Sequence, residues 1–197
     1  MDWLSGLGDV AVVAPASAAL VVGLLLLGAR RDAVTFALAM FVCVVLALLA
    51  KLAFAACGFA PRFDIESPSG HAALGAAFYG SLAALLAGGR PVGVRLVLYV
   101  AAACAAAAVA YGRVELRAHS VAEVICGLLI GAAAAALFVT LRGQPRRLSL
   151  TPRMLVRASP IAVLLAIDLA LFTDRWTAEP LIDRFAWAIG VALKLCS

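Results

Sequence analysis

The chain has 197 residues, of which 65% are hydrophobic and only 14% are charged, and its mean hydropathy is +1.09. This composition excludes an ordinary soluble domain and predicts an all-α protein that crosses a membrane several times. The net charge is +5, from 16 basic and 11 acidic residues. The basic residues are distributed unevenly between the two faces of the membrane, so the positive charge reflects membrane topology and does not indicate a nucleic-acid partner.

Six apolar segments approach the length of about 20 residues that a membrane-spanning helix needs. They cover residues 10–29, 34–57, 69–87, 94–111, 120–141 and 155–173. The connections between them are short, so we expect one transmembrane domain over residues 1–197. The start, Met1-Asp2-Trp3, lacks the basic region of a secretory signal. The first segment is therefore predicted to be a membrane helix that is not cleaved off as a signal peptide. Residues 174–197 favour an amphipathic helix at the membrane interface, with a short re-entrant element as the alternative.

The charged residues divide unevenly between the two sets of turns that alternating segments produce. The turns after the first, third and fifth segments hold nine arginines and one acid, Asp32. The arginines are Arg30, Arg31, Arg90, Arg95, Arg142, Arg146, Arg147, Arg153 and Arg157. Because basic turns tend to stay in the cytoplasm, we expect a plasma (inner) membrane protein with both termini on the outer, periplasmic face. Lys51, His71, Arg113 and His119 then all lie on that outer face and can converge on one site.

The first of the two histidines, His71, follows the sequence Ser67-Pro68-Ser69-Gly70. This sequence favours a helix start, with Ser67 as N-cap and Pro68 at the first helical position. Backbone amides near Ser69 and Gly70 would then face an anion at the positive end of the helix. A histidine there could exchange a proton with a leaving oxygen or with water at neutral pH. A plain helix cap with a surface histidine is the alternative.

The second histidine, His119, lies four residues before Glu123, on the same face of a predicted helix. The carboxylate could accept from one ring nitrogen and leave the other as a nucleophile. Arg113, six residues earlier, offers a planar fork that suits phosphate oxygens. Ser120 and Glu123 also form a capping-box pattern. A side chain folded back to cap the helix is not expected to orient His119 as well, so the two interpretations compete.

Together, Pro68-Ser69-Gly70-His71 and Arg113-x5-His119-x3-Glu123 resemble the second and third signature motifs of the type-2 phosphatidic acid phosphatases. These are the membrane branch of the superfamily that includes the vanadium-dependent haloperoxidases. The resemblance implies that His71 is the general acid and base. It also implies that His119 is a nucleophile that forms a phosphohistidine, and that Glu123 orients it.

The resemblance further implies a set of phosphate-binding residues: Ser69, Gly70 and Arg113. The first motif of that family places Arg-Pro seven and eight residues after a lysine, but Gly58 and Phe59 follow Lys51 at that spacing. Lys51 and Arg62, in the reversed pair Pro61-Arg62, are therefore added as candidate phosphate ligands. A lysine that only extends to the membrane interface is the alternative for Lys51.

Two further departures lie in the third motif. Gly112 stands where the family usually has serine, and Glu123 stands where it usually has aspartate, so a methylene must be accommodated. Arg117 is another basic candidate, with a simple pair to Glu115 as its alternative.

The sequence therefore predicts a membrane-integral lipid phosphatase that hydrolyses a lipid phosphomonoester or pyrophosphate on the outer face. We expect no cofactor and no metal; the five cysteines form no CxxC pair, and there is no dense carboxylate cluster. The expected partners are the lipid phosphate and membrane lipids, and a homo-oligomer or a larger membrane complex is compatible with the sequence. The alternative function is a catalytically inactive lipid-phosphate-binding or scaffold subunit. A transporter is less favoured, because Asp168 is the only acid deep within a segment.

Overall fold

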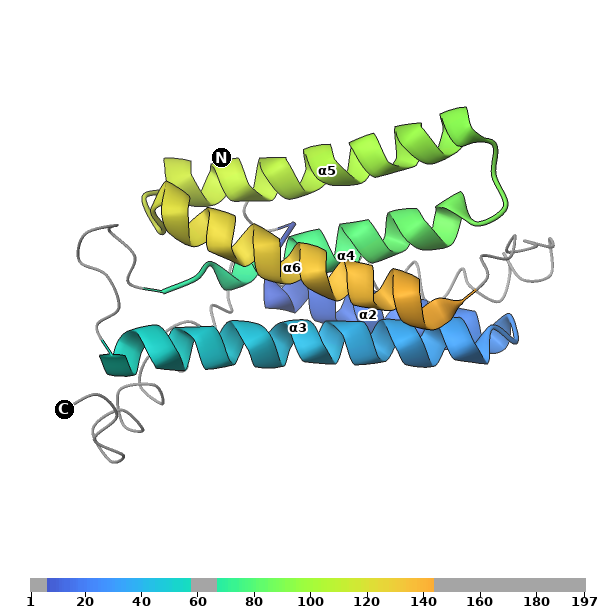
Figure 1. Cartoon of the computed structure of the whole chain (residues 1–197), viewed down its shortest axis with the longest axis horizontal. Helices are drawn as coiled ribbons and strands as arrows, with labels where there is room; N and C mark the ends of the chain where they lie inside the picture. Colours follow the sequence, from blue (N-terminus) through green and yellow to red (C-terminus); the bar gives the residue numbers. More distant parts are fainter. Residues whose placement is uncertain (1–6, 58–66, 144–197) are drawn as a thin grey trace.

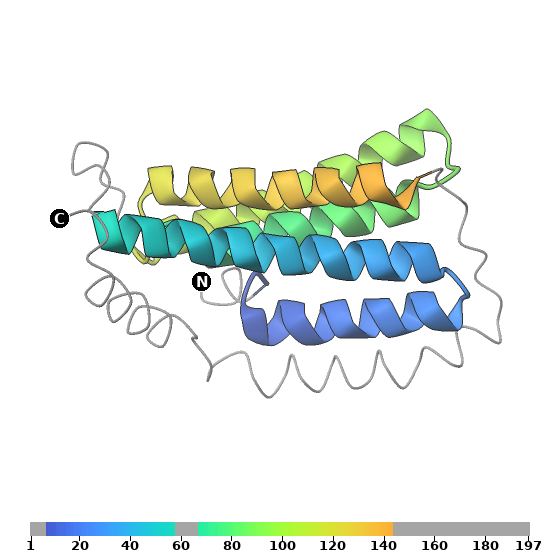
Figure 2. The same cartoon turned by 60° about the horizontal axis from the view of Figure 1, so that its bottom comes forward.

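The computed structural model describes residues 7–57 and 67–143, and this part of the chain is built from α-helices (Figure 1). There are five described helices: α2 (Val10–Leu26), α3 (Arg30–Cys57), α4 (Gly70–Ala87), α5 (Val92–Glu115) and α6 (Val121–Arg142). Consecutive helices run in opposite directions, and all five helices lie roughly side by side (Figures 1 and 2).

The five helices correspond to the first five predicted segments, which confirms an all-α polytopic membrane bundle. Helices α3 to α6 are long and apolar enough to cross a membrane, and α2 is a shorter apolar helix of 17 residues. The segment 155–173 and the predicted interfacial helix 174–197 lie outside the described residues. The largest boundary errors are four residues each: α3 begins at Arg30 instead of residue 34, and α5 continues to Glu115 instead of ending at residue 111. Polar residues limit an apolar segment, but arginine and glutamate are good helix formers and do not end a helix.

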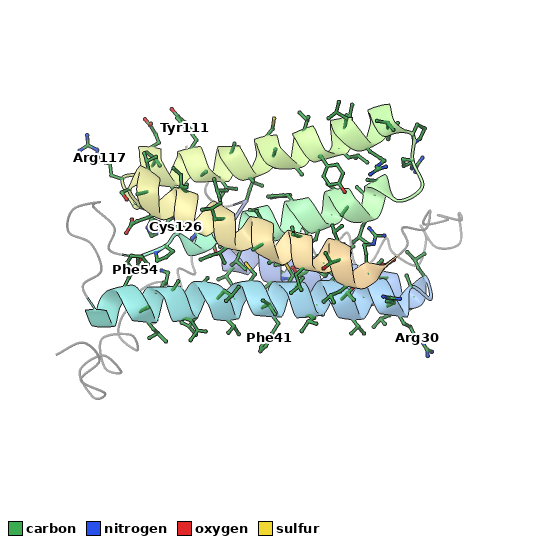
Figure 3. All side chains as sticks on the ribbon, in the orientation of Figure 1. Arg30, Phe41, Phe54, Tyr111, Arg117 and Cys126 are labelled. Atoms are coloured by element: carbon green, nitrogen blue, oxygen red, sulfur yellow. The ribbon has the colours of Figure 1, made fainter. Side chains whose placement is uncertain are left out.

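The outward surface of the bundle is apolar along its length. Phe41, Leu96 and Leu129 are each more than 60% exposed, and Figure 3 shows Phe41 pointing away from the other helices. A soluble protein rarely exposes so much contiguous apolar surface, whereas lipid chains solvate it without penalty. The exposed face therefore agrees with a membrane location for the described helices.

Helix α4 lies at the centre of the bundle and packs closely against α6 through small residues. On α6, a Cβ atom added at Gly127 would collide with the carbonyl oxygen of Ser69, and one added at Gly131 would collide with that of Ala73. Such close backbone approach is the usual packing mode of membrane helices, which lack a hydrophobic drive to associate. The contact fixes the start of α6 beside the start of α4, where both histidines lie.

We expect Gly131→Ala to destabilise the bundle, because the added methyl group has no room beside Ala73. The expected cost is about 1–3 kcal/mol, as for other overpacked interiors. Gly23 in α2 is the matched control, since nothing lies within 4 Å of a Cβ added there. Gly23→Ala should be neutral or stabilise by up to about 1 kcal/mol through helix propensity. Thermal unfolding of the two variants in detergent measures this difference; equal melting temperatures would contradict the packing role of Gly131.

At the opposite end of the bundle, arginines bind the carbonyl groups that end two helices. The guanidinium of Arg31 donates to the carbonyl of Leu141 through Nε (3.1 Å) and Nη2 (2.9 Å). Arg142 donates to the carbonyl of Ala84 and lies 3.3 Å from Asp32 Oδ1 through Nε. Carbonyl groups in a last helical turn lack helical partners, so these arginines hold the ends of α4 and α6 to the start of α3.

Candidate functional site

The first histidine, His71, lies in the first turn of α4 and contacts a carboxylate from another helix. Its Nε2 atom is 3.1 Å from Oδ2 of Asp9, and both side chains are largely buried. Asp9 is also the N-cap of α2, since its Oδ1 accepts from the Ala11 amide at 2.8 Å. Gly8 makes this approach close, because a Cβ there would lie 2.6 Å from the His71 carbonyl oxygen. The alternative of a surface histidine on a plain cap is therefore wrong.

Asp9 is ionised in this setting, and the causes act in opposite directions. Burial raises the pKa of its carboxyl group. The contacts with His71 and with the Ala11 amide lower it, as does the positive charge of Arg113, and these effects together outweigh burial. The pKa of Asp9 thus lies below its ordinary value. Asp9 therefore presents a charged carboxylate to the His71 ring.

The second histidine, His119, is held by Glu123 from the first turn of α6. The Nδ1 atom of His119 lies 2.9 Å from Oε2 of Glu123, and each side chain is 7% exposed. The same Oε2 accepts from the Ser120 amide at 2.9 Å, while the Ser120 hydroxyl accepts from the Glu123 amide at 3.3 Å. The capping box and the histidine contact therefore coexist, and the expectation that they compete is wrong. One carboxylate oxygen has the lone pairs for both contacts.

Glu123 also connects the two sequence motifs. Its second oxygen, Oε1, accepts from the Ser67 amide at 2.6 Å, and its carbonyl accepts from the Ser69 amide at 3.1 Å. The methylene that glutamate adds relative to aspartate is thus accommodated in a carboxylate that spans three partners. Glu123 is 5% exposed, so each of these contacts lies in a desolvated setting.

The start of α4 differs from its prediction by two residues. Ser69, and not Ser67, is the N-cap, with its hydroxyl accepting from the Ala72 amide at 3.4 Å, and the helix begins at Gly70. Ser67 lies two residues before this cap, and its amide donates to Glu123, a partner 56 positions away. Ser69 is fully buried, so its hydroxyl caps the helix from inside the bundle and is not at the surface.

Arg113 lies in the last turn of α5 and is 6% exposed. Its carbonyl accepts from the amides of Ala118 at 3.1 Å and His119 at 3.3 Å, which holds the α5–α6 turn closed. Arg117, within this turn, has a left-handed φ of 52° and is exposed. Figure 3 shows its side chain extending away from the bundle, so it does not join the site.

Lys51 lies near the end of α3 and is only 5% exposed. Its Cε atom would be 4.0 Å from a Cβ added at Gly70, so its side chain lies over the first turn of α4. This placement disagrees with a lysine that extends to the membrane interface. The structure thus brings Lys51, Gly70 and the two histidines to one end of the bundle, whereas Arg62 lies outside the described residues.

Within residues 7–57 and 67–143, Asp9 is a charged residue of this end that the sequence motifs did not identify. It precedes the first apolar segment, on the membrane face predicted for both histidines. Its position, an acidic residue at the end of an apolar segment on that face, was the sequence feature that could have identified Asp9 as a site residue. Within residues 7–57 and 67–143, no group of three histidine, cysteine, aspartate or glutamate side chains could hold a metal ion.

Comparison with known proteins gives a family match and a similar protein for this chain. A family model described as the PAP2 superfamily matches residues 51–147, from Lys51 to just beyond α6. An uncharacterised 22.5 kDa protein in the cps region of Klebsiella pneumoniae is 34% identical over 96% of this chain and 92% of its own length. No solved structure matches the chain. The matched family indicates phosphatase-type, hydrolytic chemistry.

Proposed function

Because this chain belongs to the PAP2 superfamily, we propose that it is a membrane-integral phosphatase that hydrolyses a lipid phosphomonoester or pyrophosphate through a phosphohistidine. The observation that carries the proposal is that each histidine at this end of the bundle has its own carboxylate partner, Asp9 for His71 and Glu123 for His119. Nucleophile and proton donor with separate orienting groups are what two-step phosphoryl transfer needs.

The proposed first step transfers the phosphoryl group to the protein. Glu123 accepts from Nδ1 of His119, so Nε2 is the nitrogen that attacks phosphorus, in line with the leaving oxygen. The phosphorus–oxygen bond to the lipid breaks as His71 gives its proton to the leaving oxygen. Water then attacks the phosphohistidine while His71 takes a proton from it, and inorganic phosphate leaves with His119 restored.

The proposed cationic groups stabilise the equatorial oxygens during both steps. Arg113 and Lys51 are each at most 6% exposed, and a charge in such a desolvated site interacts more strongly with an anion than it would in water. The backbone amides at the start of α4 add the positive end of a helix dipole. Ser69, Gly70 and Arg62 remain proposed phosphate ligands on the strength of the family resemblance.

We also propose that the site faces the outer, periplasmic side of the plasma membrane. Helices α2, α4 and α6 end, and α3 and α5 begin, at the end of the bundle away from the histidines, where Arg30, Arg31, Arg90, Arg95 and Arg142 lie. Basic residues favour the cytoplasmic side. Labelling of single cysteines at each end of the bundle in intact cells tests this orientation.

Asp9 is proposed as a positioning residue for His71, and Asp9→Asn tests it cleanly. Asparagine is as good an N-cap as aspartate, so α2 keeps its cap and only the negative charge is lost. Without that charge the His71 ring loses the carboxylate that positions it at 3.1 Å. We expect kcat to fall by about 10- to 100-fold with little change in KM. An unchanged kcat would reduce Asp9 to a helix cap.

The same carboxylate makes a small pH-dependent contribution to stability. Its pKa is lowered on folding, so the stabilisation is present above the ordinary aspartate pKa and is lost as the pH falls below it. The melting temperatures of the native protein and Asp9→Asn should therefore converge as the solution is acidified below about pH 4.

The function is tested by phosphate release from the purified protein in EDTA, with phosphatidic acid, phosphatidylglycerophosphate and a polyprenyl pyrophosphate as substrates. Release from at least one lipid in the presence of chelator is the expected result. The second candidate, an inactive lipid-phosphate-binding or scaffold subunit, is favoured by the altered first motif, where Gly58 and Phe59 replace Arg-Pro. Binding of these lipids by folded protein without any phosphate release would support that candidate instead.

A further inference from the structure

The end of the bundle away from the histidines contains a basic pocket. Its volume is about 240 Å³. Three arginines line it: Arg90 from the α4–α5 turn, Arg95 from the first turn of α5, and Arg142 from the last turn of α6. Arg90 and Arg95 are exposed, whereas Arg142 is 5% exposed. The pocket therefore combines two accessible cations with one buried cation.

Arg142 is fixed in place but has an unused hydrogen-bond donor. Its Nε atom contacts Asp32, and its guanidinium lies 5.2 Å from the ring centre of Phe138. The Nη2 atom is buried and has no hydrogen-bond partner in the described part of the chain. Buried guanidinium donors without partners are costly. Asp32 balances one positive charge, so the other two arginines leave the pocket with an excess that an anion would neutralise.

An apolar groove joins this pocket. Figure 1 shows α5 and α6 meeting near the histidine end and diverging toward the other end. Between them lies a groove of about 650 Å³ whose walls are largely small side chains, among them Ala76, Gly80, Ala103 and Ala136. Tyr99 and Val139 line both the groove and the basic pocket, so the two lie side by side.

From this arrangement we infer that the pocket and the adjoining groove form a second, non-catalytic lipid site, which binds an anionic phospholipid. The phosphate of its headgroup lies among the three arginines, and one of its chains lies in the alanine groove. Basic pockets between membrane helices select anionic headgroups by charge. The alanines leave room for a chain beside α5 and α6. This inference concerns the end opposite to the histidines and does not rest on the proposed catalytic function.

The test is lipid binding by the full-length protein in detergent, measured by native mass spectrometry during titration with dioleoyl phosphatidylglycerol or dioleoyl phosphatidylcholine. The expected result is tighter binding of phosphatidylglycerol. Arg95→Gln should weaken this binding about fivefold, which corresponds to one basic residue near a membrane surface. Arg30→Gln is the matched control: Arg30 is exposed near the same end, and Figure 3 shows it pointing away from the bundle.

The groove is tested by a second matched pair on α5. Ala103 lines the groove and Ala101 does not, and both are exposed. Ala103→Phe should lower retention of phosphatidylglycerol several-fold, and Ala101→Phe should leave it unchanged.

Three results would overturn the inference. They are equal binding of the two lipids by the native protein, equal weakening by Arg30→Gln and Arg95→Gln, and equal retention in the two alanine variants. A lower melting temperature for Ala103→Phe without added lipid, together with no phospholipid binding, would instead assign the groove to another part of this chain.

Discussion

Replacement of His119 by alanine is expected to abolish phosphate release, with a loss of about 10⁴-fold or more in kcat. The reason is that no other described nucleophile is oriented by a carboxylate at the start of α6. Glu123 holds Nδ1 of His119 at 2.9 Å, and both side chains are 7% exposed. Removal of the ring leaves Arg113, the proposed phosphate ligand, in place, so the variant should still bind the lipid.

The measurement is single-turnover phosphate release from ³²P-labelled lipid, with an alkaline detergent quench that preserves a phosphohistidine. Native protein should give transient label that is acid-labile and alkali-stable, and His119→Ala should give none. Arg117→Ala is the control, because that side chain is exposed two residues away and extends from the bundle. Full turnover in a folded His119→Ala protein would refute the phosphohistidine mechanism.

The second large effect is expected at Glu123, and it runs against the family pattern. Glu123→Asp installs the acid that the resembled motif usually has, yet we expect kcat to fall by about 100-fold or more. The shorter side chain cannot span His119 Nδ1, the Ser120 amide and the Ser67 amide together. An amide left unpaired in this buried setting should also cost about 1–3 kcal/mol of folding stability.

Glu123→Gln distinguishes the effect of side-chain length from the effect of the negative charge. It keeps the length of the side chain but removes the negative charge that orients His119, so turnover should fall with a smaller loss of stability than in Glu123→Asp. Glu115→Asp, at the exposed end of α5, is the control for a glutamate-to-aspartate change. Thermal unfolding in detergent and phosphate release, measured on the same samples, distinguish the two effects. A stable and fully active Glu123→Asp protein would show that the Ser67 contact is dispensable.

The helices and the convergence of the site could be predicted from the sequence, because hydropathy and alternation are strong constraints in a membrane protein. Alternation alone brought Lys51, His71, Arg113 and His119 to one end of the bundle. The spacing of His119 and Glu123 gave their contact directly, because residues four apart share a helix face.

The remaining parts of the site depend on packing between helices, to which local patterns are insensitive. Asp9 reaches His71 only because Gly8 lies against the backbone of α4. Ser69, and not Ser67, is the N-cap of α4, and the Ser67 amide donates instead to a side chain of α6. The two roles of Glu123 looked exclusive while each was considered as a local motif. A contact between residues 56 positions apart has no local sequence pattern that could predict it.

The carboxylate partners of the two histidines come from the first and the last of the described helices, and this arrangement bears on how the protein is made. Asp9 precedes α2, the first described helix to leave the ribosome, and Glu123 lies in α6, the last. Helices that enter the bilayer in order of synthesis cannot complete the pair until α6 has packed against α4. A nascent or truncated chain that lacks α6 should therefore be inert toward lipid phosphates, so hydrolytic activity would report completed insertion into the bilayer.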